Sequence, residues 1–135
     1  MKASLIVYIN KSTKTLPLLI YALNQQTEKD FEVVIAQDGK GDDVEKILQQ
    51  AKAITTFSIT HLTHNDGCYK REVMLNRAIV LAKSDYLIFI EEGAIPHHKF
   101  IEEHIRLSRY GKVVAAKTIE LSNEFSSEVT LKMVS

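Results

Sequence analysis

Five short apolar runs, separated by stretches with helical periodicity, constrain the fold of this chain more than any other feature. The runs are SLIVYI (4–9), FEVVIAQ (31–37), TFSITHL (56–62), DYLIFIE (85–91) and KVVAAKTI (112–119). Their starts lie about one strand–helix–strand crossover apart, which is typical of a doubly wound parallel sheet. Four runs are almost continuously apolar or β-branched, as strands covered on both faces are. The third run alternates with polar residues and is expected at an edge of the sheet.

The stretches between these runs place apolar residues at helical spacing. They are LPLLIYALNQQ (16–26), DDVEKILQQAK (42–52), KREVMLNRAIVLAK (70–83) and HHKFIEEHIRLSRYG (97–111). Pro17 suits a first helical turn, and Asp42 and Asp43 suit the positive amino end of the second helix. We therefore predict an α/β fold in one domain, residues 1–135, with a doubly wound, mainly parallel sheet and helices on both of its faces.

Composition narrows the class of protein. The 135 residues carry 17 Lys and Arg against 17 Asp and Glu, so no basic excess favours a nucleic-acid partner. No run approaches the roughly 20 apolar residues that a membrane span needs. Cys68 is the single cysteine, which excludes an internal disulfide and fits a reducing compartment. We expect a cytoplasmic protein without a membrane span.

Polar residues follow the strands at the place where doubly wound sheets bind ligands, beyond the carboxyl ends. Asn10 follows the first run, Asp38-Gly39 the second, and Glu91-Glu92-Gly93 ends the fourth. The sequence has neither the glycine fingerprint of dinucleotide-binding folds nor a P-loop. Each tip also has a plain structural interpretation, because Asp-Gly is an ordinary turn dipeptide and acids at a strand end are often solvated.

Two long segments carry the resemblance to a known family. SLIVYINKSTKTLPLLIYALNQQTEKDFEVVIAQDGKGDD has a strand, a polar turn, a helix ending in a Q-T pair and then a DFEV strand. LNRAIVLAKSDYLIFIEEGAIPHHKFIEEH follows in the same order. Together they resemble family 2 glycosyltransferases with a GT-A fold, over roughly residues 4–122. The resemblance implies a domain that binds a nucleotide-diphosphate sugar, with UDP as the expected nucleotide, for transfer of a glycosyl group to an acceptor hydroxyl in polysaccharide biosynthesis.

The resemblance also implies roles for residues at the strand tips. Asp38 would accept the N–H of a uracil or similar base, and the backbone near Ile9 and Asn10 would line the same pocket. Lys70 or Arg71, near the start of the third helix, would reach the diphosphate.

The fourth run meets the family's D-x-D motif, whose acids hold Mg²⁺ or Mn²⁺ against the diphosphate. Glu91 falls on the first acid, close to the ribose and the metal, and Gly93 falls on the last acid. Glu92 can replace that acid only if the chain bends sharply, because neighbouring side chains of a strand point to opposite faces. His97 and His98 are expected to be exposed rather than metal ligands. The acid set is incomplete, so Glu91 and Glu92 are candidate ligands while Gly93 counts against a bound metal.

Two functional hypotheses remain open at this point. The first is a donor-binding domain of a glycosyltransferase, without a visible catalytic base and with the family's acceptor half absent. The second is a non-catalytic module for assembly or nucleotide binding derived from such an enzyme. In the tail, 123–135, EVTLKMV alternates as a strand does, which predicts pairing with a sheet edge and a homodimer.

Overall fold

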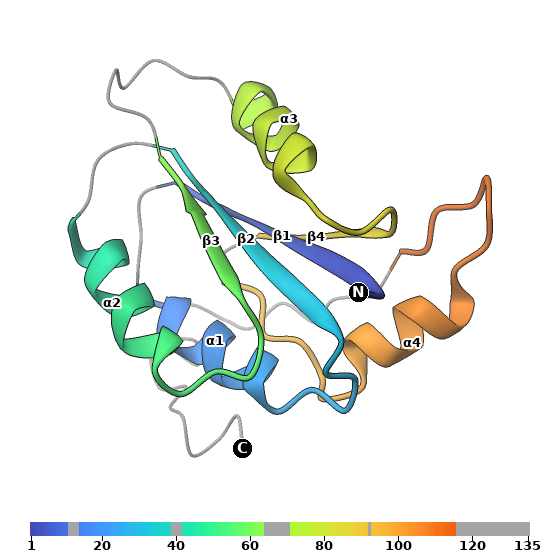
Figure 1. The fold of residues 1–135 in the computed structure, drawn as a ribbon, viewed down its shortest axis with the longest axis horizontal. Helices are drawn as coiled ribbons and strands as arrows, with labels where there is room; N and C mark the ends of the chain where they lie inside the picture. Colours follow the sequence, from blue (N-terminus) through green and yellow to red (C-terminus); the bar gives the residue numbers. More distant parts are fainter. Residues whose placement is uncertain (11–13, 39–41, 64–70, 92, 116–135) are drawn as a thin grey trace.

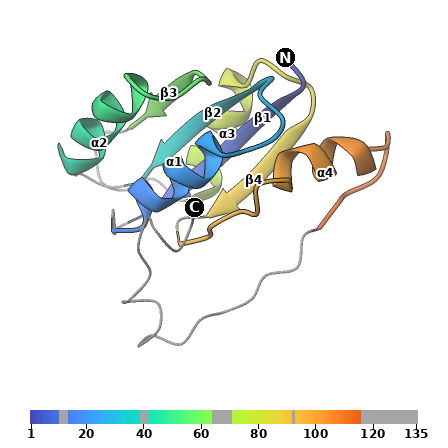
Figure 2. The same cartoon turned by 90° about the horizontal axis from the view of Figure 1, so that it is seen from below.

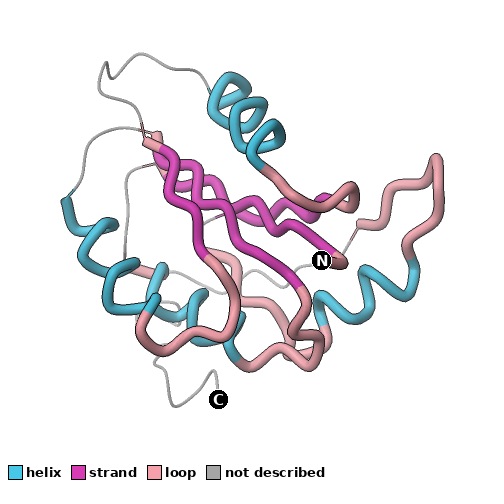
Figure 3. Tube along the Cα trace, viewed as in Figure 1, coloured by secondary structure: helices cyan, strands magenta, loops and turns pink. Residues whose placement is uncertain are grey.

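The chain forms a parallel sheet with helices on both faces (Figures 1 and 3). The computed structural model describes residues 1–10, 14–38, 42–63, 71–91 and 93–115. In chain order the elements are β1 (Ala3–Ile9), α1 (Leu16–Asn24), β2 (Phe31–Gln37), α2 (Asp42–Lys52), β3 (Ile59–Leu62), α3 (Arg71–Leu81), β4 (Leu87–Glu91) and α4 (Phe100–Leu107). No helix among the described residues is long and apolar enough to cross a bilayer.

The strand order is β3-β2-β1-β4, and every pair of neighbours is parallel. The chain moves outward from β1 through β2 to β3 and then crosses back to lay β4 on the other side of β1. The strand order therefore reverses between β1 and β4, as in doubly wound sheets. The predicted α/β class is confirmed, and the third run lies at an edge of the sheet as predicted.

The larger part of the core lies between the sheet and three helices. Strand alternation turns Leu5, Val7 and Ile9 of β1 towards this face, and all three are at most 1% exposed. Helices α1, α2 and α4 cover it, each contributing buried apolar residues such as Leu19, Leu48 and Ile101 (Figure 2). Packing on this face holds in place the strands whose carboxyl ends form one edge of the sheet.

The other face of the sheet is covered by α3 among the described elements (Figure 2). Ile6, Val34 and Ala36 pack there against Met74 and Ala78 of the helix. The amino end of α3 lies near the carboxyl edge of the sheet, where Arg71 contacts Glu91 at the end of β4. Arg71, its first residue, is thereby placed beside the strand tips.

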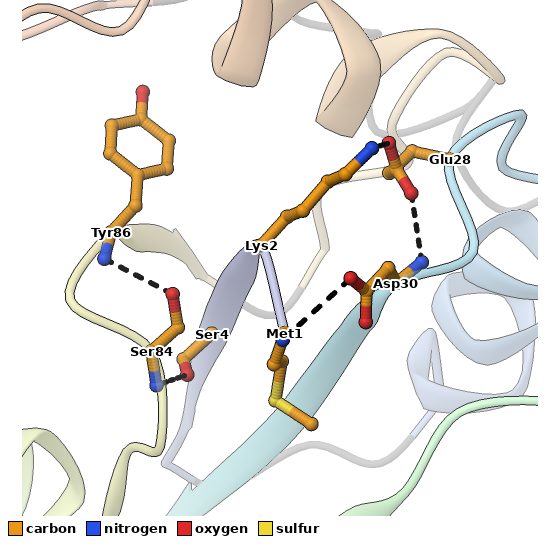
Figure 4. A network of polar contacts seen from close by, with 7 residues as sticks. All are labelled: Met1, Lys2, Ser4, Glu28, Asp30, Ser84 and Tyr86. Carbon is orange, nitrogen blue, oxygen red and sulfur yellow. Dashed lines mark hydrogen bonds and ion pairs between the residues drawn. The ribbon is translucent and has the colours of Figure 1, made fainter.

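Polar contacts fasten the opposite, amino edge of the sheet, and Figure 4 shows those made by Ser4 and Ser84. Ser4 Oγ donates to Glu32 Oε1 at 2.6 Å, and both residues are fully buried. The backbone N–H groups of Lys83 and Ser84 donate to Glu32 Oε1 and Ser4 Oγ, at 2.6 Å and 3.0 Å. These bonds hold the turn between α3 and β4 against β1 and β2, since buried polar groups need partners.

Several predicted boundaries and exposures are wrong. β3 begins at Ile59 rather than 56, and β4 begins at Leu87 rather than 85. α2 has the predicted bounds, whereas the other three helices end earlier than predicted. Phe89 of β4 is 52% exposed, because α3 packs mainly over β1 and β2 and β4 is the last strand of the described sheet. In the predicted fifth strand, residues 112–115 form no strand, and 116–119 lie outside the described residues, as does the tail 123–135.

Candidate functional site

An open groove lies at the carboxyl edge of the sheet, where the strand order reverses. It has a volume of about 330 Å³ and is lined by residues of β1, β4 and the start of α3: Ile6, Tyr8, Arg71, Leu75, Phe89, Ile90 and Glu91. Doubly wound sheets bind ligands at this switch point, because the loops on either side part there. The groove has apolar walls and a charged pair, as small-molecule sites commonly do.

Tyr8 and Asp38 form the first polar contact of the site. The Tyr8 hydroxyl donates to Asp38 Oδ2 at 2.7 Å, and the Asp38 backbone N–H donates to the carbonyl of Ile9 at 2.8 Å. Burial, followed by the hydrogen bond to Asp38 and its negative charge, raises the pKa of Tyr8 to about 12. The phenol therefore stays protonated near neutral pH and orients the carboxylate at the tip of β2.

Arg71 and Glu91 form the second polar contact. The Arg71 guanidinium is paired with the Glu91 carboxylate, and both side chains are more than half exposed. The guanidinium carbon also lies 5.3 Å from the centre of the Tyr8 ring, within the range of a cation–π contact. Because Tyr8 and Glu91 are neighbours in the β1–β4 register, the two contacts join into one row: Asp38, Tyr8, Arg71 and Glu91.

The structure brings together three of the residues that the sequence singled out, namely Asp38, Arg71 and Glu91. Ile9 turns its side chain into the core on the opposite face, so it reaches the strand tips through its backbone alone. Asn10 is exposed immediately after β1. Lys70 and Glu92 lie outside the described residues. The ligand-binding roles of all seven stay predictions.

Tyr8 belongs to the site and was missed by the sequence analysis, which treated its run as apolar. Two signals in the sequence point to it. Its position in the strand places it on the face opposite Ile9, and a partly buried tyrosine hydroxyl usually has a hydrogen-bond partner. A tyrosine one residue before the end of a strand is therefore a candidate to contact polar loop residues.

The chain turns sharply directly after β4. Gly93 has a φ of 88°, in the left-handed region that glycine adopts without strain, and the Ala94 N–H donates to the Glu91 carbonyl at 3.3 Å. A Cβ at Gly93 would meet no atom within 4 Å. The described backbone therefore turns at Gly93.

The donors present in the described residues do not fit Mg²⁺ or Mn²⁺. These hard cations prefer several oxygen ligands, carboxylates above all. No group of three His, Cys, Asp or Glu side chains that could hold a metal occurs in the described ranges. The carboxylate of Glu91 is engaged by Arg71 and that of Asp38 by Tyr8. His97 and His98 are exposed and lie against each other, with ring centres 4.0 Å apart.

A further polar pair lies beside the tip of β2. His61 Nε2 lies 2.7 Å from Gln37 Oε1, and burial lowers the pKa of the imidazole below its ordinary value of 6.5. The His61 ring is half-buried although β3 is an edge strand of the described sheet. An edge strand leaves one flank open, but neighbouring side chains still cover its faces.

Comparisons with known proteins place this chain in a family. The family model "Glycosyl transferase family 2" matches residues 4–131. The chain is 31% identical over 108 residues to the uncharacterized glycosyltransferase YfnE of Bacillus subtilis (strain 168), covering 78% of this chain and 26% of that protein. It is 23% identical over 105 residues to chondroitin synthase of Escherichia coli, covering 77% of this chain and 15% of the relative. The chain thus spans about a quarter or less of the curated relatives that it matches.

Solved structures share the same arrangement of strands and helices. Residues 1–349 of S. aureus TarS in complex with UDP superpose with a TM-score of 0.65 at 22% identity, covering 78% of this chain and 31% of that one. The UDP-GlcNAc complex of the same protein gives a TM-score of 0.65 at 23% identity, covering 78% and 30%. The fold is therefore that of the TarS glycosyltransferase. Since the family model covers nearly the whole chain, this protein belongs to glycosyl transferase family 2.

Proposed function

We propose that this chain binds a nucleotide-diphosphate sugar, with UDP as its nucleotide, as the donor for transfer of a glycosyl group to an acceptor hydroxyl. The observation that carries the proposal is the row of Asp38, Tyr8, Arg71 and Glu91 along the carboxyl edge of the sheet. Membership of the glycosyltransferase family supports the reaction class. The TarS complexes with UDP and UDP-GlcNAc show that a protein of this fold holds such a donor.

Asp38 is the group proposed to recognise the base. Uracil presents an N–H flanked by two carbonyls, so a carboxylate is a suitable acceptor. A carboxylate can accept several hydrogen bonds, and the bond from Tyr8 therefore fixes its orientation without using all of its accepting capacity. Hydrogen bonds to charged acceptors contribute roughly 1.5–3 kcal/mol each, enough to set a preference for one base.

Thermal unfolding with added nucleotides tests the proposal. A ligand that binds the native state alone stabilises it by about 2.7 kcal/mol at 100 times its Kd, so UDP is expected to raise the Tm by several degrees. ADP is expected to raise it less. Asp38→Ala should remove the difference between UDP and ADP, whereas Asp43→Ala, which deletes an exposed acid of α2, should preserve it. Equal Tm values with and without millimolar UDP would contradict donor binding.

A non-catalytic module for assembly is the second candidate, and Gly93 is the observation that favours it. A glycine offers no carboxylate where the family has the last acid of its metal-binding motif. This alternative predicts self-association that UDP does not change, together with a Tm that is insensitive to UDP.

A further inference from the structure

The contact between Arg71 and Glu91 points to a different way of holding a diphosphate from the metal clamp that the family resemblance implies. We propose that Arg71 supplies the positive charge for the diphosphate, so that the groove binds a nucleoside diphosphate without a divalent cation. The inference rests on the proposed function, because it concerns the same donor site.

Glu91 already has a cationic partner. Its carboxylate falls on the first acid of the motif, and it is paired with the guanidinium of Arg71. A divalent cation at Glu91 would have to displace Arg71 or lie beside its positive charge. Like charges at such short range repel, so the two cations compete for one carboxylate.

Arg71 is held by Glu91 and Tyr8. Its guanidinium contacts Glu91 through one nitrogen and lies over the Tyr8 ring, at 5.3 Å from the ring centre. Arginine presents five N–H donors in a planar fork, so a single carboxylate does not use all of its donating capacity. Guanidinium groups bind phosphate oxygens in pairs with good geometry, and Arg71 lines the groove.

The chain turns directly after β4. Gly93 stands where the family has its last metal-binding acid, and its positive φ suits a residue without a side chain. Among the described residues that line the groove, the only carboxylate is that of Glu91, which is already paired with an arginine. This pair of side chains is better suited to an anion bound by the guanidinium than to a metal ion with octahedral coordination.

Titration calorimetry of the whole chain tests the inference. The chain is titrated with UDP and with uridine, and each titration is carried out in excess EDTA and again in Mn²⁺. The expected result is a UDP affinity that agrees within about twofold between the two conditions. Binding of UDP in Mn²⁺ alone would overturn the inference and leave the proposed function intact. Absence of UDP binding in both conditions would overturn both.

Two variants separate the roles of the charged pair. Arg71→Gln is expected to weaken UDP binding in EDTA by about tenfold or more while leaving uridine unchanged, because a charge-assisted hydrogen bond is lost. Arg77→Gln removes the same charge from a later turn of α3, outside the groove lining, and is the matched control. Equal effects of the two variants on UDP would overturn the role of Arg71.

Glu91→Gln gives effects of opposite sign under the two mechanisms. If Arg71 carries the charge, removing the neighbouring carboxylate tightens UDP binding by about twofold to fivefold, as expected for one exposed charge. If a metal is the clamp, the same variant removes a ligand and weakens UDP binding in Mn²⁺. The inference is overturned if Mn²⁺ raises the UDP affinity of the wild-type chain and Glu91→Gln weakens UDP binding in Mn²⁺.

Discussion

At the scale of single residues, Tyr8 connects the two halves of the site. Its hydroxyl holds Asp38 on one side and its ring lies under Arg71 on the other. Tyr8 lies in β1 between Val7 and Ile9, which are both buried, so the core fixes its position. A rigid strand thereby orients two side chains that come from β2 and α3.

Tyr8→Phe should lower the free energy of unfolding by about 0.5–1.5 kcal/mol, because it removes one partly buried hydrogen bond. The raised pKa means that the folded chain favours the protonated phenol. The contribution of this hydrogen bond to the free energy of unfolding is therefore complete below pH 10. It is lost as the pH rises towards about 12. Urea unfolding of both proteins at several pH values measures the difference, which should shrink across that window.

Tyr86→Phe is the matched control for Tyr8→Phe. The Tyr86 hydroxyl donates to the carbonyl of His104 at 3.0 Å, away from the groove lining. We expect a similar loss of stability but an unchanged UDP affinity, whereas Tyr8→Phe should weaken UDP binding. Equal UDP affinities of the two variants would show that Tyr8 does not orient Asp38 for binding.

At the scale of elements, Gln26 joins α1 to the segment that follows β4. The side chain is 1% exposed, and its Nε2 donates to the carbonyls of Ala22 and His97 at 3.2 Å and 2.8 Å. Its Oε1 accepts from the backbone N–H of Ile101, in the first turn of α4, at 3.1 Å. One amide thus satisfies backbone groups of two helices and of the loop between β4 and α4.

Gln26→Ala should destabilise the fold by about 1–3 kcal/mol, because it leaves the buried N–H of Ile101 without this partner. Thr27→Val is the control, since the Thr27 hydroxyl makes an exposed bond to Glu102 and its loss should cost less than about 1 kcal/mol. Urea unfolding compares the two variants. If Gln26→Ala were as mild as Thr27→Val, the amide would not be what fastens α4.

At the scale of the whole molecule, α3 exposes several apolar side chains as well as burying others. Val73, Ile79, Val80 and Leu81 are all more than a third exposed, while Met74 and Ala78 are buried against the sheet. Phe89 on the neighbouring edge strand is half exposed too. Exposed apolar side chains that lie close together are often covered by a partner, so self-association of the chain stays a prediction.

We expect sedimentation at tens of micromolar to show a dimer. Val80→Lys should reduce the association and change the free energy of unfolding by less than about 0.5 kcal/mol, because Val80 is 83% exposed. Asn76→Lys adds the same charge at another exposed position of α3 without removing an apolar side chain, and should reduce association less. A wild-type chain that sediments as a monomer would contradict the prediction.

The acids at the strand tips could be predicted from the sequence because strand ends and turns are local features. Asp38 follows an apolar run directly, and the rule for parallel sheets then places it near Glu91 at one edge. The partners of these acids could not be predicted in the same way. Tyr8 meets Asp38 across the β1–β2 pair, and Arg71 meets Glu91 across a crossover of 20 residues.

By itself, the sequence determined the class of fold, the order of its elements, the edge position of β3 and the acids at the strand tips. These features follow from hydrophobic periodicity, which depends on neighbours along the chain. The tertiary structure alone decided that Glu91 pairs with Arg71, that Gln26 and Glu32 are buried, and that Phe89 is exposed. Such contacts depend on which strands lie side by side and which helix covers them, and that arrangement is set by packing of the whole chain.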